Sequence, residues 1–391
     1  MEISYIDRIL SFLLDSKTRG RILPFILVTA FLVRIFICFG ANLSHTIVDS
    51  DEYFQQADEL LKGGYINYFP NGYPFIIAFT KLISSSSAVN LLLFLNVLLG
   101  TCSVYFVYSI SKNIFQNTGI ALLAALLLAI FPTQINYTRW LLTEVPSTFF
   151  LLGFYAFYLK KKYLLAGLLA GLAVVIRTEL LAIFFLVVIA DLILSKSVRW
   201  KLLAGLAIPI LIVGFYAYKK TGNFSLSGHE RINIMYSITS SGGYVDWYFQ
   251  DKHPEITTTG QAVELYVDYM KKDPITYIKN RLANLWELWG FFPSSSDGER
   301  SIVSRLLIGS INFFLLFFGF CGLYKNYKKE NVIKLIFPFL VVTGVHTILL
   351  ALPRYTFTAE PFLLILASYC CWILLTKLIV IKSPDSENTS P

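Results

Sequence analysis

Long apolar segments separated by short polar breaks run through most of the sequence, and this pattern predicts membrane-spanning helices. A helix needs roughly 20 mostly apolar residues to cross about 30 Å of hydrocarbon. Continuous apolar runs, rather than short alternating strands, favour helices over a β-barrel. We therefore predict an all-α fold, a polytopic transmembrane helical bundle of about ten spans. The predicted spans are residues 22–43, 88–110, 118–134, 143–159, 163–177, 179–195, 201–218, 302–324, 332–352 and 357–378. The stretch 73–83 is too short to cross, and we expect it to re-enter the bilayer or to pack at its surface.

The placement of Lys and Arg predicts the orientation of this bundle. If the N-terminus is cytoplasmic, the short loops on that side carry most of the basic residues, including the run Lys160–Lys162. The short loops on the other side carry only Lys62, Lys81, Arg139, Arg177 and Arg354. Retention of basic residues on the cytoplasmic side is the positive-inside rule. We therefore predict cytoplasmic termini and a multi-pass protein of the plasma (inner) membrane.

Composition agrees with this assignment. Only 15% of the residues are charged and 55% are hydrophobic, with a mean hydropathy of +0.61, whereas soluble domains carry about 25% charged residues. The net charge of +8 lies in membrane-flanking loops that face an anionic leaflet, which argues against nucleic acid as a partner. The histidines and cysteines show no ligand spacing, so we predict no disulfide framework and no metal site.

The spans divide the chain into membrane and surface parts. We predict a cytoplasmic interfacial helix over 1–21, a transmembrane core over 22–218 that includes a first outer loop over 44–87, an extracytoplasmic region over 219–300, C-terminal transmembrane helices over 301–380 and a cytoplasmic tail over 381–391. The densest polar and acidic sequence lies in the two outer segments. We therefore expect the chemistry at the extracytoplasmic surface, not at the bilayer midplane where transporters bind their substrates.

The first outer loop contains an amphipathic helix that ends at Gly63. Its simplest interpretation makes Ser50 the N-cap, with two acidic residues at the positive end of the helix dipole. However, three carboxylates, those of Asp49, Asp51 and Glu52, cluster a few residues after a membrane exit. Adjacent residues on a helix point about 100° apart, so Asp51 and Glu52 cannot both act on one atom. We expect one to act and the other to orient it.

The second outer segment contains Asp273 followed by Pro274, an N-cap with proline at the first helical position. Ile278, Leu282 and Trp289 follow at helical spacing. Tryptophan is frequent at membrane–water boundaries, so we expect a helix that lies on the outer leaflet before the span at 302. This helix is a membrane-surface scaffold, with or without a share in substrate binding.

Several segments, taken in order, resemble the C-type glycosyltransferase (GT-C) superfamily. The pattern SDEYFQQADELL, followed by FPNGYPFIIA, is similar to the first outer loop of that superfamily, and above all to that of dolichyl-phosphate-mannose protein mannosyltransferases and the bacterial lipid A aminoarabinose transferase. Further similar segments are NYTRWLLTEVPSTFF (136–150), VVIRTELLAIFF (174–185), DPITYIKNRLANLWELWG (273–290) and PRYTFTAEPFLLILA (353–367). The resemblance covers most of residues 22–370. The chain lacks the large soluble domains of the mannosyltransferases, which leaves the acceptor open.

The resemblance implies a membrane-embedded, inverting glycosyltransferase that moves a sugar from a polyprenyl-phosphate carrier to an extracytoplasmic acceptor. The family's acidic pair in the first outer loop matches Asp51 and Glu52, and Asp49 is a rival for the catalytic role. A carboxylate accepts the proton of the acceptor hydroxyl. We expect Asp51 to be this base.

The leaving group of such a reaction is a lipid phosphate, whose growing negative charge favours arginine. The outward-facing candidates are Arg139, Arg177 and Arg354, the last followed by Tyr355 in the family's Arg-Tyr segment. Each arginine has a structural alternative, an ion pair, a helix cap or a contact with lipid headgroups. Glu144 binds the sugar or pairs with an arginine, since an acidic residue inside a span faces the protein. No cofactor is expected beyond the lipid-linked donor.

Two other functions compete with this one. A transporter or flippase of a lipid-linked sugar or small solute would show inverted repeats and broken helices in matching halves, and the sequence shows no internal repeat. A scaffold subunit that has lost activity would keep its function when the carboxylates are removed.

Overall fold

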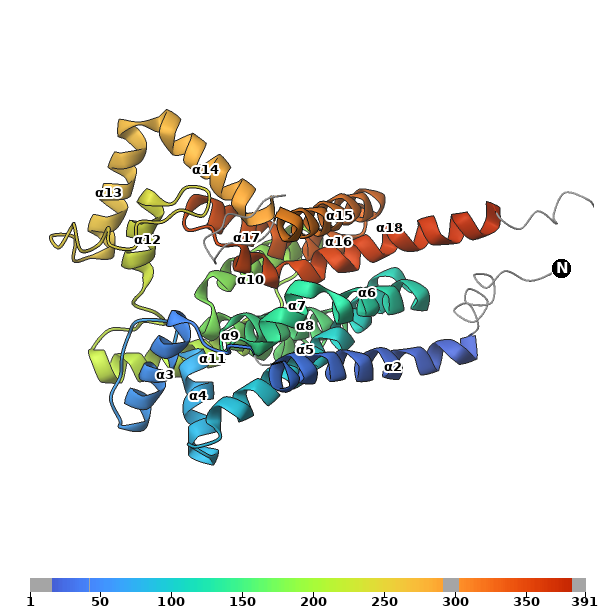
Figure 1. The fold of residues 1–391 in the computed structure, drawn as a ribbon, viewed down its shortest axis with the longest axis horizontal. Helices are drawn as coiled ribbons and strands as arrows, with labels where there is room; N and C mark the ends of the chain where they lie inside the picture. The colour runs from blue at the N-terminus through green and yellow to red at the C-terminus, as the bar shows by residue number, and fades with distance from the viewer. Residues whose placement is uncertain (1–15, 42, 291–301, 382–391) are drawn as a thin grey trace, which may run out of the picture.

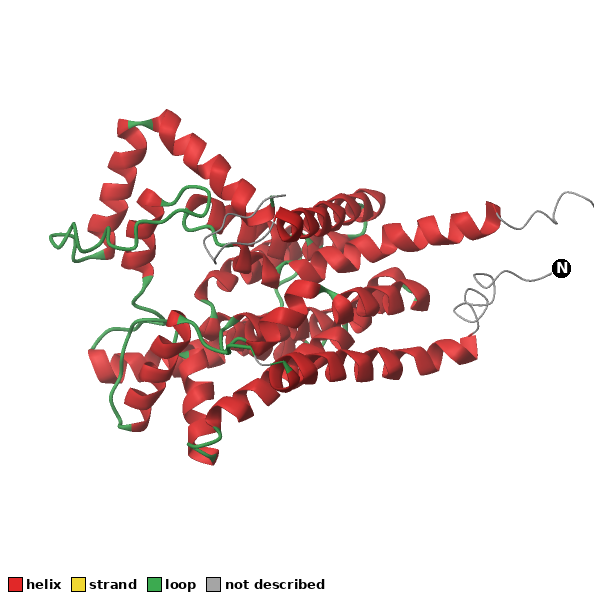
Figure 2. Cartoon of the chain, viewed as in Figure 1, coloured by secondary structure: helices red, strands yellow, loops and turns green. Residues whose placement is uncertain are grey.

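The computed structural model describes residues 16–41, 43–290 and 302–381, and these residues are helical apart from turns and loops (Figure 2). The bundle contains α2 (Ser16–Ile35), α5 (Ala88–Phe115), α6 (Thr118–Ile130), α8 (Glu144–Leu159), α9 (Tyr163–Ile176), α10 (Leu181–Leu194), α11 (Trp200–Thr221), α15 (Ile302–Asn326), α16 (Glu330–Leu335), α17 (Phe337–Ile348) and α18 (Glu360–Ile381). Shorter elements join them, namely η1 (Phe36–Gly40), α3 (Val48–Leu61), α4 (Gly72–Ile83), α7 (Pro132–Asn136), η2 (Tyr137–Arg139), η3 (Thr178–Leu180), α12 (Glu230–Thr239), α13 (Thr259–Lys272), α14 (Pro274–Trp289) and η5 (Pro353–Thr358). Within the described residues the only β-type pairing is an isolated bridge between Ser241 and Tyr244.

The two ends of the bundle contain different parts of the chain. The start of α2 and the end of α18 lie at one end (Figure 1). The elements α3, α12 and α13 lie at the other end, which we call the loop end (Figure 1). This arrangement places residues 44–87 and the described residues 219–290 of the two predicted outer segments on the same side of the bundle. The predicted interfacial helix over 1–21 and the tail over 381–391 fall largely outside the described residues.

Each of the ten predicted spans falls on helical structure, but the number of crossings is not confirmed. In the described part of the chain, six helices are long and apolar enough to cross a membrane, or seven if the bent pair over 118–139 is one span. The others are shorter, such as α9 with 14 residues, which is about 21 Å long. The stretch expected at 73–83 is the short helix α4.

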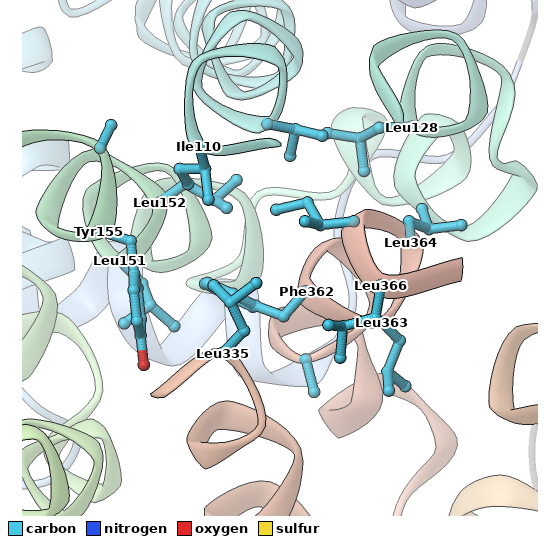
Figure 3. Close-up of a cluster of buried hydrophobic side chains, with 14 of the residues drawn as sticks. Ile110, Leu128, Leu151, Leu152, Tyr155, Leu335, Phe362, Leu363, Leu364 and Leu366 are labelled. Carbon is cyan, nitrogen blue, oxygen red and sulfur yellow. The ribbon is translucent and has the colours of Figure 1, made fainter. Parts of the chain in front are cut away.

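The core of the bundle is built on α8. Its Leu151, Leu152 and Tyr155 meet Phe362 of α18 (Figure 3), and the Tyr155 hydroxyl donates a hydrogen bond of 2.8 Å to the Lys334 carbonyl. Because lipid tails are as apolar as leucine, helices in a membrane associate through close packing. Such packing is close between α9 and α11, where a Cβ on Gly167 would lie 2.2 Å from the Leu202 carbonyl oxygen.

Charged residues inside the bundle have partners. The Arg34 guanidinium is buried and donates to the carbonyls of Ala30 and Ala129 at 3.1 and 3.3 Å. Lys334 is also buried, and its Nζ lies 2.6 Å from Asp191 and 2.6 Å from Glu330. These pairs fix neighbouring helices to one another.

The first outer loop folds as an amphipathic helix, with one correction to its predicted start. The helix α3 begins at Val48, so Ser50 is inside the first turn and is not the N-cap. The Ser50 hydroxyl instead accepts a hydrogen bond of 3.2 Å from the Ile47 N–H. The helix ends as predicted, and Gly63 adopts φ +78°, a left-handed conformation that favours glycine.

The buried Gln56 fixes the chain that follows α3. Its amide nitrogen donates to the carbonyls of Ile66 and Phe69, both at 3.1 Å, and its amide oxygen accepts from the Phe69 N–H at 3.0 Å. The turn then brings Gly72 against α9, where a Cβ would lie 2.5 Å from the Val175 carbonyl oxygen. This contact requires glycine, and it places the start of α4 against the end of α9.

The second outer segment contains three helices, α12, α13 and α14, and one arginine joins α14 to α12 and to the end of α17. The predicted cap is confirmed, since the Asp273 carboxylate accepts from the Thr276 N–H at 3.0 Å and α14 follows. The buried Arg281 of α14 then donates to the carbonyls of Ser237 and Ser240 at the end of α12, at 3.0 and 2.6 Å. It also donates to the carbonyls that end α17. We call this contact the Arg281 clamp.

Candidate active site

A cavity of about 470 Å³ lies at the loop end, between α3, α12, the start of α8, the end of α17, η3 and η5. Two groups of side chains line it. One charged group consists of Asp49, Glu144, Arg177, Glu179 and Arg354, and Glu230 of α12 also lines the cavity. The second group comes from α12 and its flanking residues and is mainly aromatic and polar.

The charged group forms a chain of alternating signs. Arg354 Nη2 lies 2.5 Å from the Asp49 carboxylate, and Arg354 Nε lies 4.0 Å from Glu144. Arg177 Nη1 lies 3.4 Å from the same Glu144 oxygen, and Arg177 Nε lies 2.6 Å from Glu179. Three carboxylates therefore face two guanidinium groups in one cavity.

Breaks between helices supply these residues. Asp49 lies in the first turn of α3 and Glu144 begins α8. Arg177 and Glu179 lie in the short interruption between α9 and α10, which the sequence predicted, and Arg354 lies in η5 between α17 and α18. Ends of helices at the loop end therefore converge on one point.

Several buried polar atoms around the cavity lack a hydrogen-bond partner among the described residues. They are Arg354 Nε, Arg177 Nη1, Glu144 Oε2, His229 Nδ1 and His346 Nε2. The two guanidinium nitrogens are near Glu144, but neither contact has hydrogen-bond geometry. A buried polar group without a partner costs free energy. Five such atoms around one cavity indicate that it receives a polar ligand.

Tyr355 supports the two arginines. Its ring stacks on His346 with a centroid distance of 4.0 Å and an interplanar angle of 18°. The guanidinium carbons of Arg177 and Arg354 lie 5.4 and 5.5 Å from its ring centroid. These distances allow cation–π attraction, so Tyr355 orients both cations toward the cavity from one side.

His229 also lines the cavity, just before α12. Its ring contacts Tyr68 and Phe69 with centroid distances of 4.4 and 4.8 Å. Burial lowers the pKa of His229 to about 4, although the negative charge of Asp49 acts in the opposite direction. The imidazole is therefore neutral at neutral pH.

The structure separates the predicted site residues into two sets. Asp49, Glu144, Arg177, Arg354 and Tyr355 all line the cavity. Three residues that the sequence also suggested lie elsewhere. Asp51 is exposed, Glu52 is half-buried beside it, and neither lines the cavity.

Arg139 has a local role away from the cavity. Its Nη1 donates to the Ser44 carbonyl at 2.5 Å, its Nε donates to Asn136 at 3.0 Å, and its guanidinium stacks 3.9 Å from the Trp140 ring. It therefore fastens the first outer loop to η2.

Sequence reasoning missed the histidines of the site. His346 lies within a predicted span, and a titratable side chain in such a position is itself a functional signal. His229 lies in the long outer segment, where its sequence surroundings carry no comparable signal. Only the fold brings it to the cavity.

Comparisons with known proteins agree with this architecture. The family described as dolichyl-phosphate-mannose-protein mannosyltransferase matches residues 70–217. No protein with a curated description matches the sequence. Among solved structures, the chain is similar to the oligosaccharyltransferase of Archaeoglobus fulgidus in its apo form, with 14% identity, a TM-score of 0.58 and coverage of 92% of this chain and 51% of that one.

Two further structures of the archaeal protein give the same picture. The form tethered to an acceptor peptide matches with 13% identity and a TM-score of 0.59, over 93% of this chain and 51% of that one. The complex with an inhibitory peptide and a dolichol-phosphate matches with 13% identity and a TM-score of 0.54, over 92% and 51%. The chain thus spans about half the length of these neighbours. The similar fold and the family match confirm the predicted resemblance to the C-type (GT-C) glycosyltransferase superfamily.

Proposed function

We propose that the chain is an inverting glycosyltransferase that takes a sugar from a polyprenyl-phosphate carrier and attaches it to an extracytoplasmic hydroxyl acceptor. One observation carries the proposal. The cavity at the loop end combines a carboxylate, Asp49, with the buried Arg177 and the partly buried Arg354, which each keep an N–H without an acceptor among the described residues. The family description names a dolichyl-phosphate-mannose donor, and the archaeal neighbour has been solved with a dolichol-phosphate. Both are consistent with a lipid-phosphate substrate.

Arg354 and Arg177 are proposed to hold the carrier phosphate. Arginine matches phosphate through charged hydrogen bonds that are stronger than neutral ones. Arg354 Nε and Arg177 Nη1 are the free donors, and both lie near Glu144 Oε1, at 4.0 and 3.4 Å. Glu144 thus sets the spacing of the two cations. We propose that these cations, and no metal ion, neutralise the leaving group.

Asp49 is proposed as the base in place of Asp51. Side chains two residues apart on a helix point in directions that differ by about 200°, because each residue rotates the direction by about 100°. Asp49 and Asp51 therefore lie on opposite faces of α3, and Asp49 is on the face that lines the cavity. A phosphate bound at Arg354 would compete with the Asp49 carboxylate for the same guanidinium, so donor binding would free the base.

The reaction then needs one displacement. The acceptor oxygen forms a bond to the anomeric carbon while the bond from that carbon to the phosphate oxygen breaks, which inverts the anomeric centre. The acceptor proton passes to the Asp49 carboxylate, and the electron pair leaves with the lipid phosphate on Arg354 and Arg177. A nearby carboxylate also favours the oxocarbenium-like character of such a carbon.

Donor turnover by the full chain in lipid nanodiscs tests this proposal. A panel of polyprenyl-phosphate sugars is incubated with wild type, Asp49→Asn and Asp51→Asn, and free carrier phosphate is followed by mass spectrometry. General-base catalysis contributes about 10²–10⁴-fold, so Asp49→Asn should lose that factor. The matched variant Asp51→Asn, two residues away on the exposed face, should stay near wild type.

Each outcome has a defined meaning. Loss confined to Asp51→Asn would refute the assignment of Asp49 while retaining the enzyme. Equal loss in both variants would mean that the acidic cluster acts through the fold of α3. If wild type releases no carrier phosphate from any donor, with saccharide and peptide acceptors present, the glycosyltransferase proposal is wrong and a transporter of lipid-linked sugar becomes the better explanation.

A further inference from the structure

One face of α12 lines the same cavity as the arginines. His229, Asn233 and Tyr236 follow one another at steps of four and three residues, which places them on one side of a helix. Trp247, from the loop that follows α12, completes this lining. We call these four residues the α12 face. None of them has a role in the displacement described above.

His229 is the polar centre of the α12 face. The side chain is 8% exposed, yet Nδ1 has no hydrogen-bond partner among the described residues. Its backbone is fixed, because the His229 N–H donates to Ser227 Oγ at 3.2 Å and the Gly228 N–H donates to the Tyr68 carbonyl at 3.1 Å. A fixed, buried imidazole at a cavity wall is suited to hydrogen-bond a ligand group.

Tyr236 and Trp247 form the apolar part of the α12 face. Their rings meet edge to face, with centroids 5.0 Å apart and an interplanar angle of 78°. Tyr236 is 8% exposed, whereas Trp247 is 49% exposed. The buried tyrosine thus holds the indole in place and leaves part of its surface accessible. Binding sites for small molecules combine such aromatic walls with a few fixed polar groups.

Asp49 lies between the arginines and the α12 face. It contacts Arg354 on one side at 2.5 Å, and its charge acts on His229 and Tyr68 on the other. Figure 1 shows α3 and α12 at the same end of the bundle, and residues of both helices line the cavity. In an inverting displacement the nucleophile approaches opposite the leaving group. With the phosphate on the arginines, the acceptor must therefore come from the side of the α12 face.

We propose that the α12 face binds the acceptor, and that this acceptor is an uncharged saccharide. The inference rests on the proposed function, since it takes the arginines as the phosphate site. The ring of a saccharide presents C–H groups that pack on the exposed indole of Trp247. Its hydroxyls match the imidazole of His229 and the amide of Asn233, which together both donate and accept.

The chemistry of the α12 face favours a neutral sugar over other acceptors. His229 is neutral at neutral pH, so none of the four residues offers a cation to an acidic headgroup, and the lining residue Glu230 beside them adds a carboxylate that would repel one. The nearby Arg231 is engaged with the Ile256 carbonyl at 2.7 Å and does not line the cavity. A serine or threonine of a polypeptide would bring one hydroxyl to Asp49 but little surface for the indole.

Saturation-transfer NMR on the full chain in nanodiscs tests the assignment directly. The probes are methyl glycosides and short neutral oligosaccharides, with serine- and threonine-containing peptides as the competing class. A saccharide should bind wild type, and Trp247→Ala should weaken it about tenfold, the size expected for one aromatic contact. The matched control is Tyr248→Ala, which removes the neighbouring exposed aromatic residue outside the cavity and should stay within about twofold of wild type.

A second variant distinguishes a loss of saccharide binding from a folding defect. Circular dichroism monitors the folding of each sample. Asn233→Ala should also weaken the saccharide and leave the helical signal intact. The inference is overturned if no saccharide binds, if Trp247→Ala and Tyr248→Ala bind equally, or if peptides bind in a Trp247-dependent way instead. Carrier binding is measured separately, as competition by dolichyl phosphate in wild type and Arg354→Ala. Failure of carrier binding would refute the proposed function, whereas failure of saccharide binding alone would refute only this inference.

Discussion

The Arg281 clamp makes a prediction that does not depend on the reaction. Arg281 is buried in α14 and donates to backbone carbonyls at the ends of two other helices, α12 and α17. Replacement by alanine removes every one of these donors at once. A hydrogen bond from a charged group contributes about 1.5–3 kcal/mol. Because the bonds share one side chain they are not additive, and we expect a loss of about 3–5 kcal/mol in the free energy of unfolding.

SDS titration in mixed micelles, read by circular dichroism, measures this loss. Arg281→Lys keeps the charge but replaces a planar fork with a single ammonium group, so it should fall between wild type and Arg281→Ala. Lys279→Ala changes an exposed basic residue of the same helix and should cost no more than about 0.5 kcal/mol. If Arg281→Ala proved no more harmful than Lys279→Ala, the clamp would not hold the helices together and our account of the outer segment would be wrong.

Three further predictions concern a buried histidine, the packing of a glycine and a buried ion pair. Burial lowers the pKa of His229 to about 4 from an ordinary 6.5, so the unfolded chain binds more protons than the folded chain between these pH values. The free energy of unfolding should therefore fall by about 3 kcal/mol in total as the pH drops from about 6.5 to 4. His229→Gln should flatten this part of a stability–pH profile. Gly167→Val should destabilise by about 1–3 kcal/mol through overpacking, since a Cβ there meets the backbone of α11, whereas Gly344→Ala has open space and should cost far less in the same titration. Lys334→Met should cost about 3–5 kcal/mol by leaving the Asp191 carboxylate buried without its ammonium partner, and the double variant with Asp191→Leu should recover much of that loss.

Hydropathy predicted the class of fold but not the number of crossings, and the reason is physical. An apolar run shows that a segment is buried in something apolar, either lipid or protein. The predicted span over 163–177 became α9, whose 14 residues are too short to cross alone, and it packs tightly on α11 through Gly167. The hydropathy averaged over a window of residues does not distinguish α9 from a full membrane span. The break at Arg177–Glu179 was nonetheless predicted, because charged residues between two apolar runs mark a helix end.

Much of the charged half of the cavity could be predicted, whereas the α12 face could not. Arg177, Glu144 and Arg354 stand out because charged residues at the ends of apolar helices are costly unless they serve a purpose. Asn233 and Trp247 lie in a long polar segment, where residues of these types are ordinary. Their meeting at one cavity depends on the Arg281 clamp, a long-range contact that no local pattern announces.

The choice between Asp49 and Asp51 depends on which face of α3 each residue occupies. With Ser50 taken as the N-cap, Asp49 lies before the helix and Asp51 opens it. Because α3 begins at Val48, Asp49 joins the stripe of Tyr53 and Ala57, which are four and eight residues later and buried. Asp51 joins the opposite stripe with exposed Gln55 and Lys62.

A carboxylate on the inward face of an amphipathic helix is costly unless a cation meets it. Here Arg354, some 300 residues away in the sequence, meets Asp49 at 2.5 Å. A carboxylate on the outward face needs no such partner, and Asp51 is exposed. The placement of one paired acid on the cavity side and one exposed acid on the solvent side is what favours Asp49 as the base. For the same reason, a comparison of Asp49→Asn with Asp51→Asn separates a chemical role of the acid from a structural one.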